Sequence, residues 1–245
     1  MTLIAERNSR IFSENAFKIA PHIFRVEQQK GEIIKLNLGE PDFALPLHIK
    51  NEIKRQLDLD NTKYCDPKGL LSLREAISTQ INHTRGLQKT PEHVVVFPGG
   101  KPPIGLAQQV YCDPGDEVIY PSPGFPIYES FIRYVGAVPV PLHLKETANF
   151  TFPPEELAEK ITPKTKLIYF NFPSNPTGAV ASAKQLEDYA NVILKNCSKD
   201  IRIYSDEIYE NIIFDGKKHH SISSINEIRD RTIIASGFSK TFAWT

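Results

Sequence analysis

The fold class is decided by the stretch Lys166-Leu167-Ile168-Tyr169-Phe170-Asn171-Phe172-Pro173-Ser174-Asn175-Pro176-Thr177-Gly178. Its first half is a short apolar run, and its second half is a polar segment with two prolines and a glycine, which is typical of a loop. Continuous apolar runs of this length indicate strands that are buried on both faces. The stretch therefore predicts an interior strand that ends in a polar loop.

Five further apolar runs of four or five residues share this character, and helix-length segments lie between most of them. Helices that alternate with buried strands predict an α/β fold, with a mainly parallel sheet sandwiched by helices. Pro139 and Pro141 favour an edge position for the third run, because proline cannot donate to a strand ladder. In chain order, these five runs are residues 94–97, 117–120, 138–142, 201–204 and 232–235.

The flanking segments predict helices and a separate N-terminal unit. Residues 70–77 have apolar residues at helical spacing, and Pro153 and Ser182 are typical of helix starts. Residues 1–46 predict one helix, a short strand at 33–36 and a turn, which is too little for a core of its own. We therefore expect residues 1–46 to form an N-terminal arm and part of a small domain, and residues 47–245 to form a large domain.

Composition limits the possible partners. The chain has 29 basic and 29 acidic residues, so its net charge is zero and no basic surface predicts nucleic-acid binding. No apolar run is long enough to span a bilayer, and the N-terminus lacks a signal-peptide pattern. Cys65, Cys112 and Cys197 are too few and too far apart for a disulfide framework or a zinc site. We expect reduced thiols, a cytoplasmic location, and neither a metal nor a membrane partner.

Unusual residues follow five of the six runs, where ligands bind in open α/β sheets. Gly99-Gly100-Lys101 follows the first run and precedes a helix that begins near Pro102. Glycines and free N–H groups at a helix start can bind a phosphate, although a plain strand-to-helix turn would use the same residues. The five loops comprise residues 98–101, 121–125, 171–178, 205–209 and 236–243.

Five side chains in these loops could hold and use an aromatic aldehyde cofactor. Asp206 follows a buried strand, where a pyridinium N–H would partner its carboxylate. Tyr209 and Asn175 could donate hydrogen bonds to a ring oxygen, Phe125 offers a flat apolar face, and Lys240 could form an imine if it loses its proton. Each also has an ordinary explanation, such as a helix cap, core packing or a solvated lysine. Only their combination favours the cofactor.

These residues together resemble the class I/II aminotransferases, the fold-type I enzymes that depend on pyridoxal phosphate, and in particular the bacterial aspartate and aromatic aminotransferases. The resemblance runs from about Ile34 to Thr245. Four motifs carry it, namely Leu38-Gly39-Glu40-Pro41-Asp42-Phe43, Asp113-Pro114-Gly115-Asp116-Glu117-Val118, Asn175-Pro176-Thr177-Gly178 and Ser239-Lys240-Thr241-Phe242-Ala243.

The resemblance implies a role for each site residue. Lys240 would be the catalytic residue, forming the internal aldimine and then moving a proton to and from the substrate α-carbon. Substrate binding would use Gly39, Phe125 and Asn175. Cofactor binding would use Gly99, Gly100, Lys101, Phe125, Asn175, Asp206, Tyr209, Lys240 and, toward the partner subunit of a homodimer, Tyr64.

The resemblance also implies parts that this chain lacks. The family pattern continues past Thr245 with arginines that bind the cofactor phosphate and the substrate carboxylate, so the chain resembles a C-terminally truncated member. The family's next strand would insert between the first and fourth runs. We expect transfer of an amino group between an L-amino acid, aspartate or aromatic, and a 2-oxo acid. Another fold-type I enzyme, such as a C–S lyase, or an inactive truncated product remains the alternative.

Overall fold

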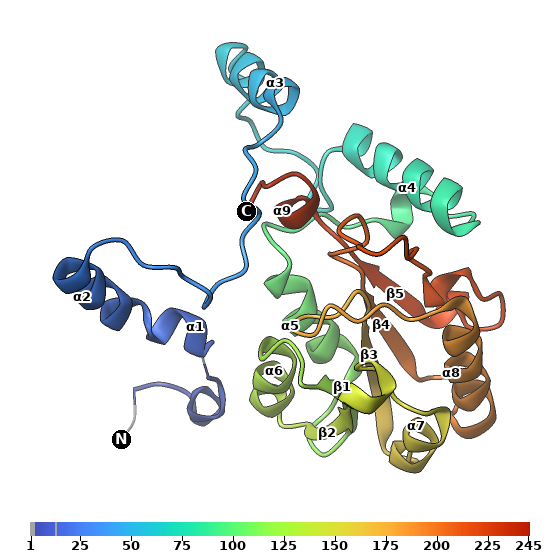
Figure 1. Cartoon of the computed structure of the whole chain (residues 1–245). Helices are drawn as coiled ribbons and strands as arrows, with labels where there is room; N and C mark the ends of the chain where they lie inside the picture. Colours follow the sequence, from blue (N-terminus) through green and yellow to red (C-terminus); the bar gives the residue numbers. More distant parts are fainter. Residues whose placement is uncertain (1–2, 13) are drawn as a thin grey trace.

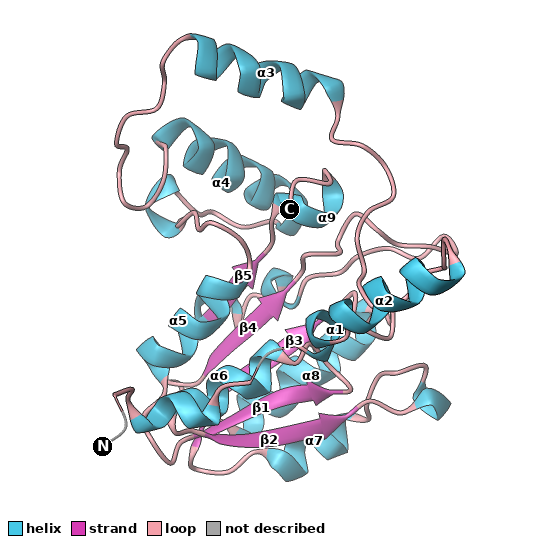
Figure 2. Ribbon diagram, turned by 90° about the vertical axis from the view of Figure 1, so that its left-hand side faces the viewer, coloured by secondary structure: helices cyan, strands magenta, loops and turns pink. Residues whose placement is uncertain are grey.

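A computed structural model describes residues 3–12 and 14–245 of the chain. Five parallel strands form one sheet in the order β2-β1-β3-β4-β5, as Figures 1 and 2 show. The predicted parallel α/β architecture is confirmed, and so is the edge position of the proline-containing third run. The strands are β1 (Glu117–Ser122), β2 (Val138–His143), β3 (Thr165–Asn171), β4 (Arg202–Asp206) and β5 (Thr232–Ala235).

Helices lie before and between the strands, and they include the three that the sequence predicts near residues 71, 154 and 183. Ser182 caps its helix by accepting a hydrogen bond from the Gln185 backbone N–H, while the Gln185 side chain bonds back to Ser182. The helices are α1 (Asn15–Lys18), α2 (Ala20–Lys30), α3 (Leu47–Asp58), α4 (Leu71–Arg85), α5 (Lys101–Tyr111), α6 (Ile127–Val135), α7 (Pro154–Lys160), α8 (Ala183–Asn196) and α9 (Phe238–Thr241). Short 3₁₀ turns lie at Glu6–Arg10, Pro91–His93, Glu146–Ala148, Ile222–Ser224 and Arg229–Arg231.

The central strand β3 is buried on both faces, as its apolar run predicts. Leu167 and Tyr169 point into one core cluster, and Ile168 and Phe170 point into the other. Side chains alternate across a strand, so a strand between two cores needs apolar residues at every position. Helices α5 and α6 pack on the first cluster and α7 and α8 on the second, which makes a three-layer sandwich (Figure 1).

Two predicted strands are absent from the described residues. Residues 94–97 and 33–36 have no regular secondary structure and belong to no ladder. Val96 donates its N–H to Lys68 O at 2.8 Å, so a loop residue serves as its partner instead of a strand. Apolar composition alone therefore overestimates strands, because a strand also needs a neighbour of matching register.

The expected insertion point for a further strand is also wrong. The fourth run is β3, which pairs with β1 on one side and β4 on the other, and so leaves no room beside it. In the part of the chain that the structure describes, the open edges belong to β2 and β5. An edge strand leaves one row of N–H and C=O groups unpaired by the sheet.

The N-terminal segment lies outside the sandwich, beside α5 and α6 (Figure 1). Arg7 Nε donates to Tyr134 Oη at 3.1 Å, and Phe12 N donates to Ser130 Oγ at 3.0 Å. The sequence predicts one helix here, whereas the structure has a 3₁₀ turn followed by α1 and α2. None of the described helices has the length and apolar character that crossing a bilayer requires.

The turn after β1 depends on a close backbone approach at Gly124. A Cβ atom at this position would lie 2.1 Å from the carbonyl oxygen of Pro121. We expect Gly124→Ala to lower the free energy of unfolding by at least about 2 kcal/mol, because a backbone atom cannot move aside as a side chain can. Urea unfolding followed by circular dichroism measures this loss.

Gly39→Ala is the matched control, because a Cβ at Gly39 meets no atom within 4 Å. Its stability should stay within about 0.5 kcal/mol of the original chain. Equal stabilities of the two variants would show that the turn relaxes freely and would contradict the steric argument.

Candidate active site

The pairing register brings three strand ends to one level at the carboxyl edge of the sheet. Asn171 of β3 lies opposite Asp206 of β4, and Asp206 lies opposite Ala235 of β5. Asn171 Nδ2 donates to the backbone oxygen of Asp206 at 3.1 Å, which ties β3 to β4 at this point. The loops that the sequence singles out after these strands therefore start side by side.

Asp206 is a buried carboxylate at the centre of this edge. Tyr128 Oη donates to its Oδ2 at 2.6 Å, and the Ile208 backbone N–H donates to its Oδ1 at 3.3 Å. Burial raises the pKa of Asp206 to about 6, and the two hydrogen bonds offset only part of that rise. Because burial disfavours the charged form, a cationic partner would bind favourably here. The hydrogen bond from the Ile208 N–H also agrees with the ordinary explanation for Asp206, in which its carboxylate caps the backbone that follows it.

Tyr128 is a site residue that the sequence reasoning missed. It lies within α6, is fully buried, and stacks on Tyr169 with ring centroids 4.7 Å apart. Burial, followed by the charge of Asp206, holds the pKa of Tyr128 far above its usual value, so the hydroxyl stays protonated and donates. A tyrosine inside an amphipathic helix carries no motif, so only the fold shows its partner.

Asn175 and Tyr209 lie together beside this carboxylate. Asn175 is held by its backbone N–H, which donates to Asn171 Oδ1 at 2.8 Å. Burial raises the pKa of Tyr209, and the charge of Asp206 adds to the rise, while the Asn175 side chain acts in the opposite direction. The structure thus brings Asn175, Asp206 and Tyr209 together, from the ends of two neighbouring strands.

Lys240 reaches the same region from α9, after β5. Its Nζ lies 5.9 Å from the centre of the Tyr209 ring and donates to the backbone oxygen of Gly39 at 2.8 Å. Two residues 201 positions apart in the sequence therefore meet at one point. Lys240 is only partly exposed, so it is not an ordinary solvated lysine.

Gly99 and Gly100 form an open turn at the start of α5. Gly99 has a φ of +95°, which favours glycine, and a Cβ at either residue would meet nothing within 4 Å. Gly100 is the N-cap of α5, and Pro102 and Pro103 follow in its first turn. Because proline has no N–H, the backbone donors of this turn are those of Gly100 and Lys101. The turn can thus bind a phosphate through the two backbone N–H groups of Gly100 and Lys101.

The Lys101 side chain points toward the N-terminal segment. Its Nζ forms an ion pair with Glu14 and lies 5.2 Å from the centre of the Phe17 ring. The ammonium of Lys101 is therefore engaged by α1 and by the residue before it. The backbone N–H of Lys101, rather than its side chain, therefore remains for an anion at this turn.

The remaining predicted residues are placed less closely. Phe125 is partly buried and meets Tyr128 edge to face, with centroids 5.8 Å apart, so it belongs to the wall next to Asp206. Tyr64 is fully exposed, in the loop after α3. Gly39 belongs to the site through its bond to Lys240.

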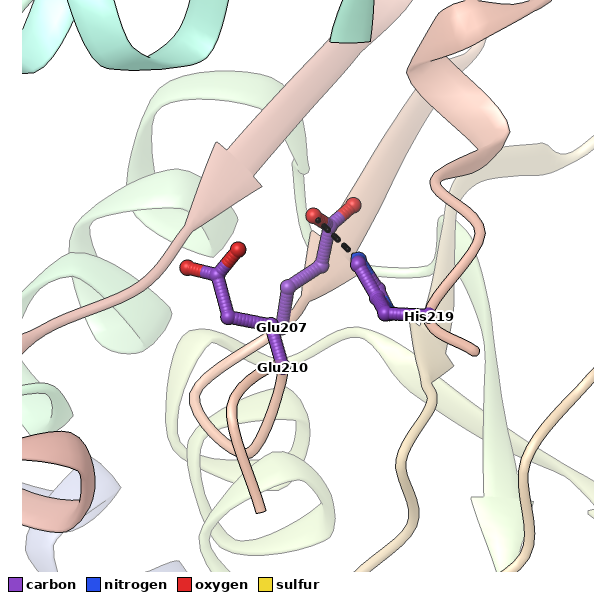
Figure 3. Close-up of side chains that lie close together, drawn as sticks. All are labelled: Glu207, Glu210 and His219. Atoms are coloured by element: carbon purple, nitrogen blue, oxygen red, sulfur yellow. Dashed lines mark hydrogen bonds and ion pairs between the residues drawn. The ribbon is translucent and has the colours of Figure 1, made fainter. Parts of the chain in front are cut away.

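A buried ion network lies on the other side of β4. Oxygen and nitrogen atoms of Glu207, Glu210 and His219 all lie within 4.8 Å of one another, as a cation site would require (Figure 3). The guanidinium of Arg85 already occupies the place of a cation, because its Nη2 binds Glu207 Oε2 at 2.7 Å and also binds Glu210 Oε2. The sequence reasoning found none of these residues, since they share no motif.

The residues at the sheet edge fit pyridoxal phosphate. The Asp206 carboxylate accepts two hydrogen bonds, and its pKa is still raised by burial. A positively charged pyridinium N–H would therefore stabilise its charged form. Gly100 offers a phosphate cradle at a helix N-terminus, and Lys240 offers an amine next to Tyr209. An acid, an amine and an anion-binding turn match the three polar ends of this cofactor.

Comparison with known proteins gives a consistent result. Residues 31–245 match the model of the family "Aminotransferase class I and II". The chain is 37% identical over 224 residues to aromatic-amino-acid aminotransferase 2 of Thermococcus litoralis, and 36% identical over 224 residues to aspartate aminotransferase of Pyrococcus abyssi. Each alignment covers 91% of this chain and 57% of the relative, so the chain spans little more than half the length of these relatives.

Solved structures extend the likeness to three dimensions. Aspartate aminotransferase of Thermus thermophilus with maleate superposes with a TM-score of 0.92 at 33% identity, covering 99% of this chain and 62% of that one. The aspartate aminotransferase of Rhizobium meliloti gives a TM-score of 0.93 at 29% identity, covering 100% and 61%. With a family match over most of its length and the site geometry above, the chain belongs to the class I and II aminotransferase family, whose cofactor is pyridoxal phosphate.

Proposed function

We propose that the protein transfers an amino group between an L-amino acid and a 2-oxo acid. The observation that carries this proposal is the meeting of Lys240 and Asp206 at one end of the sheet, where Tyr209 lies near both. The amine and the buried acid follow neighbouring strands, β5 and β4, and the turn of Gly99 and Gly100 at the start of α5 offers backbone N–H groups for a phosphate. No single motif of the sequence requires this convergence.

In the proposed reaction the bound cofactor supplies the sink for the electrons left at the substrate α-carbon. Asp206 would hold the proton of the pyridine nitrogen, and Tyr128 fixes the orientation of that carboxylate. With the cofactor bound, the Lys240 amine would take the proton from the substrate α-carbon and would return it to the C4′ carbon of the cofactor. Asn175 and Gly39 orient the substrate carboxylate, and Phe125 packs against the aromatic ring.

For the substrate we propose aspartate or an aromatic amino acid, supported by the names of the relatives. A second candidate is elimination by a lyase of the same fold, because both reactions begin with the same proton removal. We further propose a cytoplasmic homodimer in which Tyr64 reaches the partner's cofactor phosphate. The full exposure of Tyr64, together with the exposure of more than half of the apolar side chains Phe24 and Leu57, supports a second copy. Sedimentation velocity tests the dimer directly.

Lys240→Ala should abolish cofactor chemistry. The original 245-residue chain, incubated with pyridoxal phosphate, should develop a visible absorption band and should exchange the α-hydrogen of L-aspartate or L-phenylalanine for deuterium in D₂O. The variant should show neither, because no other amine is expected to reach the α-carbon. Absorption spectroscopy and proton NMR measure the two effects.

Lys217→Ala is the control, because Lys217 is an exposed lysine in a turn. It should retain both the band and the exchange. If the band of Lys240→Ala equalled that of the control, Lys240 would not be the attachment point. If a C–S substrate gave products of elimination faster than either amino acid exchanged, the lyase would replace the aminotransferase.

Asp206 should make the stability of the cofactor-free chain depend on pH. Its pKa of about 6 lies above the ordinary value of 3.8, so folding takes up a proton between these values. The stabilisation is full below about pH 4 and is lost as the pH rises through 6, by about 3 kcal/mol in all. Asp206→Asn removes this loss, so the variant should gain stability relative to the original chain as pH rises from 4 to 7.

Urea unfolding at a series of pH values measures the difference. Added pyridoxal phosphate should reduce it, because a pyridinium partner favours the charged carboxylate. A difference that stays constant from pH 4 to 7 would show that Asp206 titrates normally, which would remove the basis of its role.

A further inference from the structure

The residue after Asp206 carries a second buried carboxylate, which faces away from the cofactor residues. Glu207 has no exposed surface, and its two oxygens accept five hydrogen bonds. The donors come from α4, from β4 and from the loop that follows β4. They are Arg85 Nε at 3.0 Å, Arg85 Nη2 at 2.7 Å, His219 Nε2 at 3.0 Å, Ser205 Oγ at 2.7 Å and Ser221 Oγ at 2.5 Å.

This shell keeps Glu207 charged. Burial alone would raise its pKa, but the His219 hydrogen bond, the charge of Arg85 and the Ser221 hydroxyl outweigh burial and lower it. Arg85 is itself almost fully buried and is the last residue of α4, where a positive charge is favoured by the helix dipole. The pair is therefore a fixed ion pair, in which each partner would be costly without the other.

Arg85 also connects Glu207 to the segment that carries Lys240. Its Nη2 binds Glu210 Oε2, and Glu210 Oε1 accepts a hydrogen bond from Ser236 Oγ at 2.9 Å. Ser236 follows β5 directly and lies four positions before Lys240. One guanidinium thus joins the residue next to Asp206 with the residue that begins the lysine segment.

We propose that Arg85, acting through Glu207 and Glu210, is a positioning residue that sets the distance between Asp206 and the Lys240 segment. Its role in the reaction rests on the proposed function. Successive side chains of an extended backbone point to opposite sides, so holding Glu207 fixes the backbone from which Asp206 projects toward Tyr128. The planar fork of arginine can bind two carboxylates in one geometry, which a lysine ammonium cannot.

The network also sets the charge around Asp206. The groups that shift the pKa of its carboxyl are Tyr128 from α6 and, after β4, Glu207 and the Ile208 backbone N–H. Tyr169 from β3, Tyr204 from β4 and Tyr209 also face this carboxyl, and its charge raises the pKa of each of these phenols. The charge of Glu207 raises the pKa of Asp206, and Arg85 lies against Glu207 on the far side. Removal of Arg85 would leave the repulsion uncompensated. Removal of the Glu207 charge would relieve it.

The test compares Arg85→Met with Arg74→Met. Arg74 is a matched control, because it is a second buried arginine on α4 and bonds to Gly69 O and Pro91 O, both at 3.0 Å, away from Asp206. Both variants should lose stability. Only Arg85→Met should weaken pyridoxal phosphate binding in the folded protein, with a rise in Kd of about tenfold or more, against less than about twofold for Arg74→Met.

The double variant Arg85→Met with Glu207→Gln separates positioning from stability. It removes the uncompensated charge, so stability should recover. The Kd should stay raised, because the link to Glu210 and Ser236 is still broken. Glu210→Gln should also raise the Kd, by a smaller factor. Recovery of both stability and Kd in the double variant would overturn the proposal, as would an equal rise of Kd in Arg74→Met.

A second measurement does not need the cofactor. In the cofactor-free chain labelled with ¹³C at aspartate carboxyls, the Asp206 signal is assigned by its loss in Asp206→Asn. Its titration midpoint should move up in Arg85→Met and down in Glu207→Gln, each by about half a pH unit or more, and should not move in Arg74→Met.

The two measurements distinguish the failures. If the original chain binds no pyridoxal phosphate while the Asp206 midpoint moves as described, the proposed function fails and the link from Arg85 to Asp206 stands. If the chain binds the cofactor but neither the Asp206 midpoint nor the Kd changes in Arg85→Met, the positioning role fails and the proposed function stands.

Discussion

The site depends on the parallel pairing of β3, β4 and β5. In a parallel sheet all strands end at the same edge, so their last residues lie at one level without any further device. Here that level holds Asn171, Asp206 and Ala235, and each loop that continues from them carries a residue of the site. A shift of one residue in β4 would replace Asp206 by a side chain that points to the other face.

Much of this arrangement can be predicted from the sequence because it depends on local pattern. Apolar runs locate the five strands, and polar loops rich in proline and glycine locate their ends. Asp206, Asn175 and Lys240 are recognisable because they interrupt those patterns. The two predicted strands that fail, at 94–97 and 33–36, have the composition of strands but lack a neighbour to pair with. Strand pairing is a property of the whole fold, and it cannot be predicted from the composition of one run of residues.

Two of the residues that escaped prediction act over long sequence distances. Tyr128 meets Asp206 across 78 positions, and Arg85 meets Glu207 across 122. Tyr128 looks like an ordinary core residue, and Arg85 looks like an ordinary helix-terminal arginine. Both are informative because each buries its polar group inside the protein, where a polar group without a hydrogen-bond partner is costly. Their burial and their hydrogen-bond partners together identify them, and neither property can be read from the sequence.

The edge position of β5 has a consequence for the dynamics of the site. Strands β1, β3 and β4 are almost fully buried, whereas every residue of β5 is only partly buried and one side of its ladder is open. Amide hydrogens in such a strand exchange with solvent through small local openings of the structure. Those of the central strands exchange only when a larger part of the sheet opens. The sheet therefore has a gradient of protection from β3 outward to β5. Asp206 ends the better-protected β4, whereas Lys240 lies on α9, which follows the less protected β5.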